Sequence, residues 1–251
     1  MAHAPNPQTP ERRPLHIITP VKDSIELTLQ TIRSVLDSQL DRPFVYTIYD
    51  DFSTPENVAR LEAAVAAEGG ALQLVRLSEL TDHPSPNYRT ILCTARRKAL
   101  EAGAALVIVE SDVVVRPDTL QRLLEGAEAR PDCALAAAVT VDPSGHTNYP
   151  YEKLRELDEP VVTRHHLSFC CTLMTNRLLQ LADFETLLDP QKTWFDVPIS
   201  HFARQMQLRN YVFGNLRVVH RPHSSRPWKQ LKYANRWRYY WNKLILRPDK
   251  I

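Results

Sequence analysis

The stretch AALVIVESD, residues 104–112, joins six consecutive apolar residues to two carboxylates separated by one residue. A continuous apolar run of this kind suits a β-strand that is covered on both faces. In open α/β sheets, ligands bind beyond the carboxyl ends of the strands. The sequence therefore predicts a buried strand over residues 104–109 that ends in a polar site formed by Glu110, Ser111 and Asp112.

Strand and helix patterns alternate on both sides of this stretch. Short β-branched or apolar runs predict strands, and apolar residues at helical spacing predict helices. The predicted strands cover residues 15–20, 44–49, 72–77, 104–109 and 134–141, and the predicted helices cover residues 24–40, 56–68, 90–102 and 119–129. This alternation is typical of an α/β fold with a mainly parallel sheet flanked by helices. Ser53 or Thr54 is expected to cap the second helix.

Composition excludes several classes of protein. The chain has 251 residues, of which 43% are hydrophobic, so it can bury a core and is too apolar for a disordered protein. No apolar run approaches the roughly 18 residues of a membrane-spanning helix. The four cysteines contain no CxxC pair, which excludes a disulfide scaffold and a zinc finger and favours a reduced, cytoplasmic chain. The adjacent Cys170 and Cys171 are predicted to be core residues.

Polar residues follow three of the predicted strands, at Thr19-Pro20, at Asp50-Asp51 and at residues 110–112. Two carboxylates at one strand end can face Mg²⁺ or Mn²⁺, which prefer oxygen ligands and are often shared with phosphates. The chain has only 6 glycines and lacks both GxGxxG and the P-loop pattern. A nucleotide would therefore be held by a metal ion and basic side chains.

Several motifs, in order, resemble those of family 2 glycosyltransferases of the GT-A fold. They are IITPV (17–21), TIRSVLDSQ (31–39), YDDFST (49–54), ARRKA (95–99), VIVESD (107–112), WFDVPIS (194–200), HFAR (201–204), YVFG (211–214) and VVH (218–220). The resemblance implies a Rossmann-like GT-A sheet and an inverting enzyme. Such an enzyme moves a sugar from a nucleotide diphosphate-sugar, here a UDP- or GDP-sugar, with Mn²⁺ or Mg²⁺.

The resemblance also assigns roles to single residues. The implied nucleotide-binding residues are Thr19, Pro20, Val21, Asp50, Asp51, Arg96 and Ser111, and the implied metal ligands are Glu110, Asp112 and His220. Asp196 is implied as the base that deprotonates the acceptor hydroxyl. The chain departs from the family in having Glu110 in place of the usual first Asp, Lys22-Asp23 where an aromatic residue and Asn are common, and Phe195 where a second acid is usual.

The same residues have structural alternatives. Asp51 could begin the cap of the next helix, Asp112 could only solvate a strand end, and His220 could be a surface histidine, with His223 as a rival metal contact. Asp196 could be an ordinary acid at a helix N-terminus, where the helix dipole favours it. A catalytically degenerate relative that binds a nucleotide sugar or a glycan without turnover is the alternative function.

We expect three segments along the chain. Residues 1–14 form a polar leader that is expected to be disordered and lacks the apolar run of a secretory signal. Residues 15–225 form the GT-A domain, with a nucleotide-binding half over 15–115 and an acceptor half over 116–225. Residues 226–251 hold eight Lys or Arg, one acid and three of the four tryptophans, and are predicted to form a basic aromatic helix.

This helix has three possible partners. Tryptophan and basic residues together are typical of binding to an anionic membrane surface. Docking on the domain or on a second subunit, as in a homodimer, is the alternative, and nucleic-acid binding is not expected because no such motif accompanies the helix. We therefore expect a non-processive cytoplasmic enzyme, peripheral at the inner face of the membrane. Its expected acceptor is a glycan or lipid-linked acceptor in polysaccharide or lipopolysaccharide biosynthesis.

Overall fold

A mixed sheet of nine strands runs through the computed structural model, which describes residues 13–148, 151–221, 237 and 241. The strands are β1 (Leu15–Val21), β2 (Phe44–Asp50), β3 (Leu72–Arg76), β4 (Ala105–Val109), β5 (Val113–Val114), β6 (Cys133–Val141), β7 (Pro160–Thr163), β8 (Cys171–Met174) and β9 (Arg209–His220). The helices are α1 (Ile25–Leu36), α2 (Pro55–Glu68), α3 (Tyr88–Glu101), α4 (Thr119–Glu128), α5 (Asn176–Leu181), α6 (Phe184–Leu187) and α7 (Asp196–Gln205).

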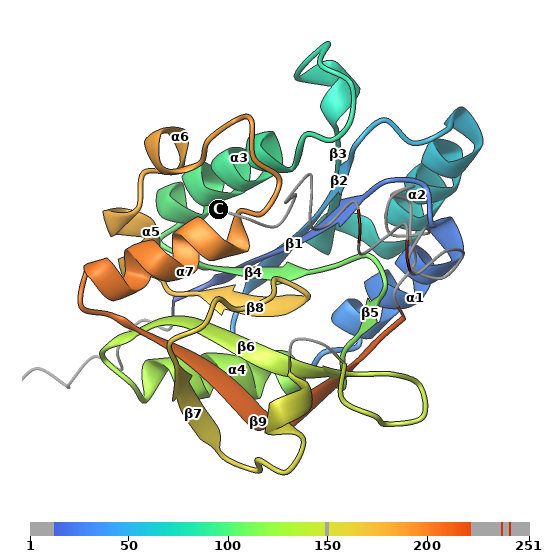
Figure 1. Cartoon of the computed structure of the whole chain (residues 1–251). Helices are drawn as coiled ribbons and strands as arrows, with labels where there is room; N and C mark the ends of the chain where they lie inside the picture. The colour runs from blue at the N-terminus through green and yellow to red at the C-terminus, as the bar shows by residue number, and fades with distance from the viewer. Residues whose placement is uncertain (1–12, 149–150, 222–236, 238–240, 242–251) are drawn as a thin grey trace, which may run out of the picture.

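The strand order is β3-β2-β1-β4-β8-β6-β9-β5, with β7 paired to β9 (Figure 1). Strands β3, β2, β1 and β4 are parallel to one another, and β6 is parallel to β9. Strand β8 lies antiparallel between β4 and β6, and β5 and β7 pair antiparallel with β9. The predicted α/β fold with a mainly parallel sheet is confirmed.

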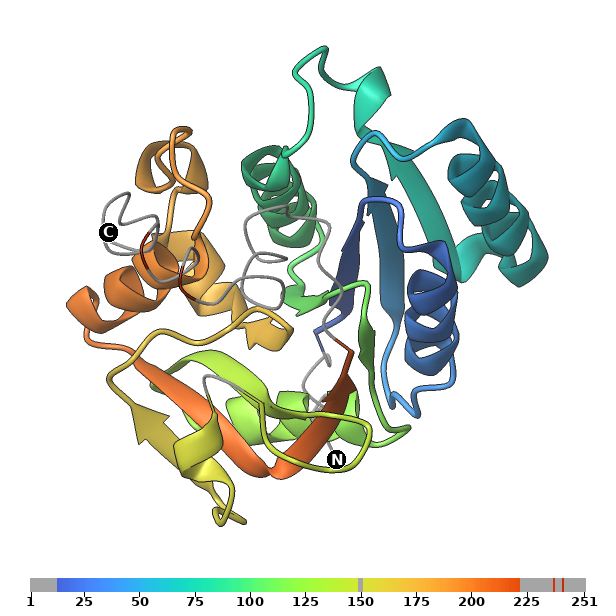
Figure 2. The same ribbon diagram turned by 45° about the vertical axis from the view of Figure 1, so that its right-hand side comes forward.

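The helices cover both faces of the sheet because side chains alternate along each strand. Val107 and Val109 of β4 face one apolar cluster, whose helical members come from α1, α2 and α4. Leu106 and Ile108 face the other cluster, with α3, α5, α6 and α7. Figure 2 shows α1 and α2 on one side of β1 to β3 and α3 on the other. Both faces of β4 are therefore buried, as its continuous apolar sequence predicts.

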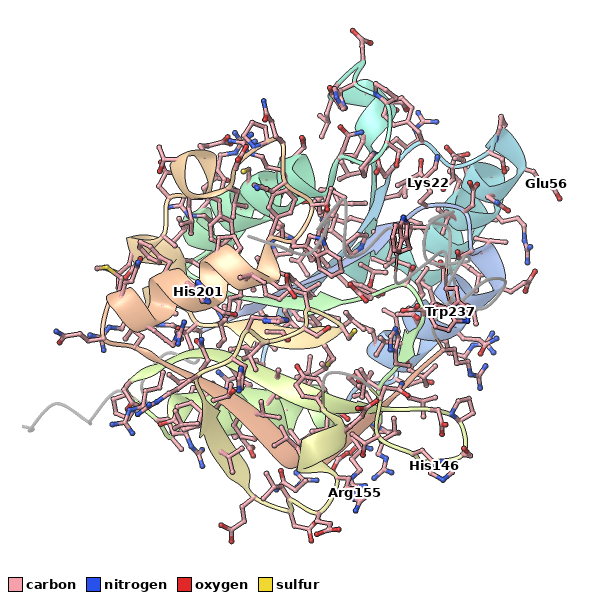
Figure 3. The ribbon with its side chains drawn as sticks, in the orientation of Figure 1. Lys22, Glu56, His146, Arg155, His201 and Trp237 are labelled. Atoms are coloured by element: carbon pink, nitrogen blue, oxygen red, sulfur yellow. The ribbon has the colours of Figure 1, made fainter. Side chains whose placement is uncertain are left out.

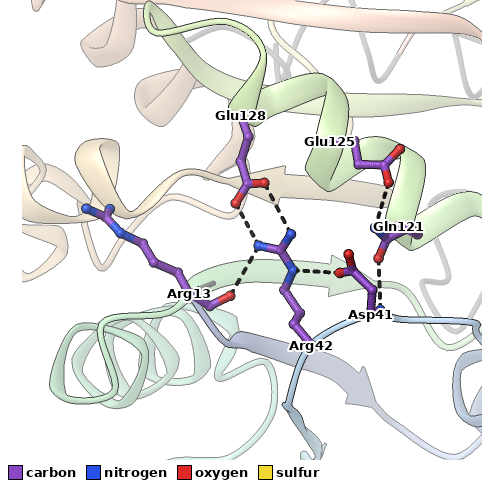
Figure 4. A network of polar contacts seen from close by, with 6 residues as sticks. All are labelled: Arg13, Asp41, Arg42, Gln121, Glu125 and Glu128. Carbon is purple, nitrogen blue, oxygen red and sulfur yellow. Dashed lines mark hydrogen bonds and ion pairs between the residues drawn. The ribbon is translucent and has the colours of Figure 1, made fainter. Parts of the chain in front are cut away.

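An arginine cluster joins three segments at the amino edge of the sheet (Figure 4). Arg42, only 8% exposed, precedes β2, and its guanidinium donates to both carboxylate oxygens of Glu128 at the end of α4, at 2.7 and 3.2 Å. The same group donates to Asp41 at 3.2 Å and to the carbonyl of Arg13 at 3.4 Å. The cluster thus ties the beginnings of β1 and β2 to α4.

Most of the two predicted terminal segments falls outside the described residues. This applies to residues 1–12 of the leader, to the whole predicted tail helix except Trp237 and Trp241, and to His223. Trp237 and Trp241 both have helical backbone and are 89% and 63% exposed. Among the helices that the structure describes, none is long and apolar enough to cross a membrane.

Candidate functional site

The pairing of β4 with β8 brings Cys170 to Glu110. Val109 pairs with Cys171 in the antiparallel ladder, and the next residues continue it, since the Glu110 N–H donates to the Cys170 carbonyl at 2.9 Å. The Cys170 thiol donates to Oε2 of Glu110 at 3.3 Å. A residue assigned to the core from its sequence therefore directs its sulfur at a predicted metal ligand.

The pairing of β5 with β9 brings His220 to Asp112 in the same way. Val113 pairs with His220, and the Arg221 N–H donates to the Asp112 carbonyl at 2.9 Å. The Nε2 atom of His220 lies 3.4 Å from Oδ2 of Asp112, and the two side chains are 15% and 8% exposed. His220 is thus not the exposed surface histidine of the structural alternative.

The two pairings create one cluster of metal-ligand types. One donor atom from each of Glu110, Cys170 and His220 lies within 4.8 Å of the other two, and the Asp112 carboxylate lies beside His220. Carboxylate oxygens suit Mg²⁺ and Mn²⁺, and an imidazole nitrogen is a common ligand of divalent transition metals. The side chains that the structure gathers therefore fit a divalent cation.

Cys170 is the residue of this cluster that the sequence analysis missed. Its predicted burial is confirmed, and burial together with the Glu110 carboxylate raises the pKa of the thiol well above its ordinary value. No local motif marks it, because its approach to Glu110 depends on the register of two strands that are far apart in the chain. Knowledge of the β4–β8 register would have revealed it.

Asp196 is the first residue of α7. Burial raises the pKa of its carboxyl to about 6, although the Val197 N–H donates to Oδ1 at 3.0 Å. A helix N-terminus alone would stabilise the charged form and lower the pKa. Desolvation therefore outweighs the helix dipole, which argues against an ordinary helix acid and is the pattern of a carboxyl tuned toward proton transfer at neutral pH.

A hydrogen-bonded segment lies between Asp196 and the metal-ligand cluster. The Ser168 hydroxyl is 3.1 Å from the Cys170 sulfur, and the Ser168 N–H donates to the Tyr151 hydroxyl at 3.1 Å. Burial raises the pKa of Tyr151, and the nearby Cys170 and Asp196 add to this effect. The Leu167 N–H donates to the Ser200 hydroxyl on α7 at 3.1 Å. Tyr151 is thus close to both parts of the candidate site.

The loops after β1 and β2 are joined at the carboxyl edge of the sheet. Lys22 donates through Nζ to the Phe52 carbonyl, and the Asp23 N–H donates to the Ser53 hydroxyl at 2.8 Å. Thr54 accepts from the Asn57 N–H at 3.4 Å and so is the predicted cap of α2. Figure 3 marks Lys22 in the first loop and Glu56 at the start of α2.

Asp51 holds a third loop at this edge. Its buried carboxylate accepts from the Ser85 hydroxyl at 2.7 Å and from the Asn87 backbone N–H at 2.9 Å and side-chain amide at 2.8 Å. Asn87 precedes α3, so Asp51 fixes the start of α3 rather than capping α2. The nucleotide-binding role that the resemblance implies for Asp51 stays a prediction.

Two other predicted nucleotide-binding residues, Thr19 and Arg96, direct their side chains to other parts of the protein. The Thr19 hydroxyl is fully buried and lies 2.8 Å from the Tyr46 hydroxyl, so this side chain packs inside the sheet. Arg96 donates to the Leu179 carbonyl at 3.0 Å and lies 5.7 Å over the Phe184 ring, so it is engaged with α5 and α6. These contacts do not support nucleotide contacts for either side chain.

The remaining four stay predictions and lie at the carboxyl ends of β1, β2 and β4. They are Pro20, half-buried, and Val21, Asp50 and Ser111, all buried. Burial raises the pKa of Asp50, whose carboxylate accepts from the Ser53 N–H at 3.3 Å.

Comparison with known proteins gives one family and one fold. The family model described as "Glycosyl transferase family 2" matches residues 16–182, from β1 through α5. No curated protein matches the chain in sequence.

Three solved structures are similar to this chain in fold. The structure of residues 1–349 of S. aureus TarS has 17% identity and a TM-score of 0.62, with 82% of this chain and 60% of that chain covered. The mannosyltransferase PcManGT from Pyrobaculum calidifontis, in complex with GDP-Man and Mn²⁺, has 18% identity and a TM-score of 0.59, with coverages of 96% and 66%. GalNAc-T7 with UDP, GalNAc and Mn²⁺ has 12% identity and a TM-score of 0.59, with coverages of 86% and 45%. The chain thus spans less than two thirds of each of them, and the likeness confirms the predicted GT-A-like fold.

Proposed function

Because this chain belongs to glycosyl transferase family 2, we propose that it transfers a sugar from a UDP- or GDP-sugar to a hydroxyl group of a glycan or lipid-linked acceptor. The proposed reaction inverts the anomeric carbon, requires a divalent cation and is non-processive. The observation that supports it most is the gathering of Glu110, Asp112 and His220 at the carboxyl edge of the sheet, close to a segment that leads to Asp196.

The metal-ligand cluster can hold the cation that the departing nucleoside diphosphate requires. Glu110, Asp112 and His220 would hold Mn²⁺ or Mg²⁺, and such an ion, when bound, neutralises the charge that develops on the departing nucleoside diphosphate. Arg96, the basic side chain that the resemblance assigns to the nucleotide, is engaged with the Leu179 carbonyl and with Asp183. The bound ion would therefore supply positive charge that Arg96 does not.

Asp196 supplies what the acceptor requires. As the acceptor oxygen forms its bond to the anomeric carbon, the hydroxyl proton passes to the Asp196 carboxylate. The bond between the sugar and the diphosphate breaks, and its electron pair leaves with the diphosphate. A raised carboxyl pKa makes Asp196 a stronger proton acceptor than an ordinary aspartate, provided that the pH keeps it ionised.

The donor and the cation are supported by structural relatives. The mannosyltransferase structure contains GDP-Man and Mn²⁺, and the GalNAc-T7 structure contains UDP, GalNAc and Mn²⁺. These two structures favour a nucleoside diphosphate-sugar with Mn²⁺ as the donor and cation of this chain. They differ from each other in the nucleotide base and in the sugar.

The test is a panel of UDP- and GDP-sugars assayed for donor hydrolysis with Mn²⁺ and with EDTA, beside the melting temperature with each nucleoside diphosphate. We expect Mn²⁺-dependent hydrolysis of one donor and a rise in the melting temperature with its nucleotide, because a ligand that binds the native state stabilises it. Absence of both effects for every donor would overturn the proposal.

A degenerate binder is the second candidate. Phe195, where a second acid is usual, is buried and packs 6.1 Å from the Tyr88 ring, so this position has taken a packing role. A rise in melting temperature with a nucleotide and Mn²⁺, without hydrolysis or transfer on any acceptor, would favour this candidate.

We also propose a position at the inner face of the cytoplasmic membrane, in polysaccharide or lipopolysaccharide biosynthesis. Trp237 and Trp241 are four positions apart, both have helical backbone, and both are exposed. Eight basic residues accompany them in residues 226–251. Exposed indoles with basic neighbours suit an anionic lipid surface, and a homodimer contact is the rival.

A further inference from the structure

Cys170 adds a donor that the motif-based metal site lacks. Its sulfur lies 3.3 Å from Oε2 of Glu110. The donor atoms of Cys170, Glu110 and His220 all lie within 4.8 Å of one another. Oxygen, nitrogen and sulfur donors thus converge from the ends of three strands, β4, β8 and β9.

We propose that Cys170 is a metal ligand in this cluster and that the site binds thiophilic divalent cations, such as Co²⁺, Zn²⁺ and Cd²⁺, in preference to Mg²⁺. The inference deepens the proposed function, on which it rests for the role of the bound ion. The binding of the cation itself requires no sugar donor and can be measured alone.

The distances suit such a site. With metal–sulfur bonds of about 2.3 Å and metal–nitrogen or metal–oxygen bonds of about 2.0 Å, donors of a tetrahedral ion lie roughly 3.3–3.5 Å apart. The Cys170–Glu110 distance of 3.3 Å is close to the upper value, which applies to a sulfur–oxygen pair. The donor atom of His220 lies within 4.8 Å of the other two, so a small rotation of its side chain would bring it to bonding distance of the same ion. Asp112, 3.4 Å from His220, is placed to complete the donor set.

The chemistry of the ligand atoms decides which divalent cations the site prefers. Mg²⁺ takes oxygen ligands and retains its waters, whereas thiolate and imidazole ligands favour the later transition metals. When the sulfur–metal bond forms, the thiol proton is released to solvent and the thiolate donates the electron pair. A site of carboxylates and imidazole alone would discriminate less strongly against Mg²⁺.

Cys171 provides a matched control. It is the next residue, it is also buried, and burial alone raises the pKa of its thiol to about 12. Cys93 is the half-buried thiol of the chain and lies in α3, so it controls for adventitious binding.

The test is a Co²⁺ titration of the full-length protein and of Cys170→Ser, Cys171→Ser and Cys93→Ser, followed by absorption in the near ultraviolet. We expect a sulfur-to-cobalt charge-transfer band in the wild type, retained in Cys171→Ser and Cys93→Ser and lost in Cys170→Ser. Excess Zn²⁺ should remove the band, and the same concentration of Mg²⁺ should not. Absence of the band in the wild type, or its persistence in Cys170→Ser, overturns the inference.

A second measurement covers the case in which Cys170→Ser does not fold. The ¹¹³Cd resonance of cadmium bound to the wild type moves strongly downfield with a sulfur ligand, and a resonance in the range of oxygen and nitrogen ligands overturns the inference. Mn²⁺-dependent donor hydrolysis without a cobalt band would overturn the role of Cys170 and leave the proposed function standing. A cobalt band without hydrolysis of any donor would support Cys170 as a metal ligand and count against the proposed function.

Discussion

The Nε2 atom of His220, the last residue of β9, lies 3.4 Å from Oδ2 of Asp112, in the turn between β4 and β5. The contact exists because Val113 pairs with His220 across the β5–β9 ladder. Two predicted metal ligands from opposite halves of the chain are therefore held together by backbone pairing rather than by a local motif. The position of β9 sets the spacing of the proposed metal ligands.

Asp112→Asn is expected to weaken metal-dependent nucleotide binding by at least the roughly 10–100-fold that loss of a partner of a metal ligand costs, because the amide keeps the shape of a proposed ligand and loses its charge. Titration calorimetry of UDP and GDP with Mn²⁺ measures this effect. Asp118→Asn is the control, since Asp118 is an exposed carboxylate of the same segment that pairs with Arg122. Equal affinities in the wild type and Asp112→Asn would exclude the metal role.

Asp196→Asn is expected to reduce sugar transfer by about 10²–10⁴-fold while donor binding is retained, because an amide cannot accept the acceptor proton. Initial rates with a competent acceptor and calorimetric donor affinities measure the two effects. Asp118→Asn is again the control, because Asp118 is an exposed carboxylate that pairs with Arg122 and has no proposed part in the reaction. A rate within a few-fold of wild type would assign the base elsewhere, with Asp189 or Glu185 next in line.

The raised pKa of Asp196 predicts two opposite pH effects. Its pKa is about 6 in the folded chain and 3.8 ordinarily, so between these values the unfolded state has already lost the proton that the folded state keeps. Folding stability contributed by this group therefore falls as pH rises from about 4 to 6, whereas transfer rises through pH 6. Asp196→Asn should melt at a higher temperature than wild type at pH 7.5 and at the same temperature near pH 4. An equal melting temperature of the two proteins at pH 7.5 would contradict the raised pKa of the Asp196 carboxyl.

Arg42→Ala is expected to lower the free energy of unfolding by roughly 1–3 kcal/mol, because it removes charge-assisted hydrogen bonds to a largely buried guanidinium. The partner Glu128 is half-exposed and can be solvated, so Glu128→Gln should cost under about 1 kcal/mol. Denaturant unfolding measures both values. The KM for the donor should not change in either variant, and a changed KM would mean that this cluster influences the site.

Replacement of both Trp237 and Trp241 by Ala is expected to abolish sedimentation with anionic liposomes at low salt, with donor hydrolysis retained. Leu80→Ala, which removes an exposed apolar side chain elsewhere, is the control. Truncation after Arg226 should have the same effect, and raised salt should weaken wild-type binding. If the truncation instead splits a dimer in light scattering, the segment is a subunit contact.

The sequence predicts the strands of the sheet where burial on both faces makes them continuously apolar. The predicted strand over residues 104–109 corresponds to β4 and that over 134–141 to β6, each within one residue. The predicted helix over 24–40 ends earlier, at Leu36, although Leu40 still packs on the core. Strand β8 was not predicted, because a segment of four mostly apolar residues does not distinguish a strand from other core segments, and its place between β4 and β6 depends on long-range pairing.

Local spacing also explains which site residues were predictable. Glu110 and Asp112 follow a strand directly, so their position at the carboxyl edge follows from the strand itself. Cys170 depends on the register of β8 against β4 and has no local signature. The resemblance places Arg96 on α3, but the direction of its guanidinium depends on α5 and α6, which lie much later in the chain.

The Arg42 cluster and the metal-ligand cluster occupy opposite edges of the same sheet. Substitutions in the Arg42 cluster should therefore mainly lower stability and expression, whereas substitutions in the metal-ligand cluster should mainly alter turnover. A mutagenesis library aimed at a new donor or acceptor can be confined to the loops after β1, β2 and β4 and the start of α7. The amino edge can meanwhile be optimised in a different library, and the best members of the two can be combined in one gene.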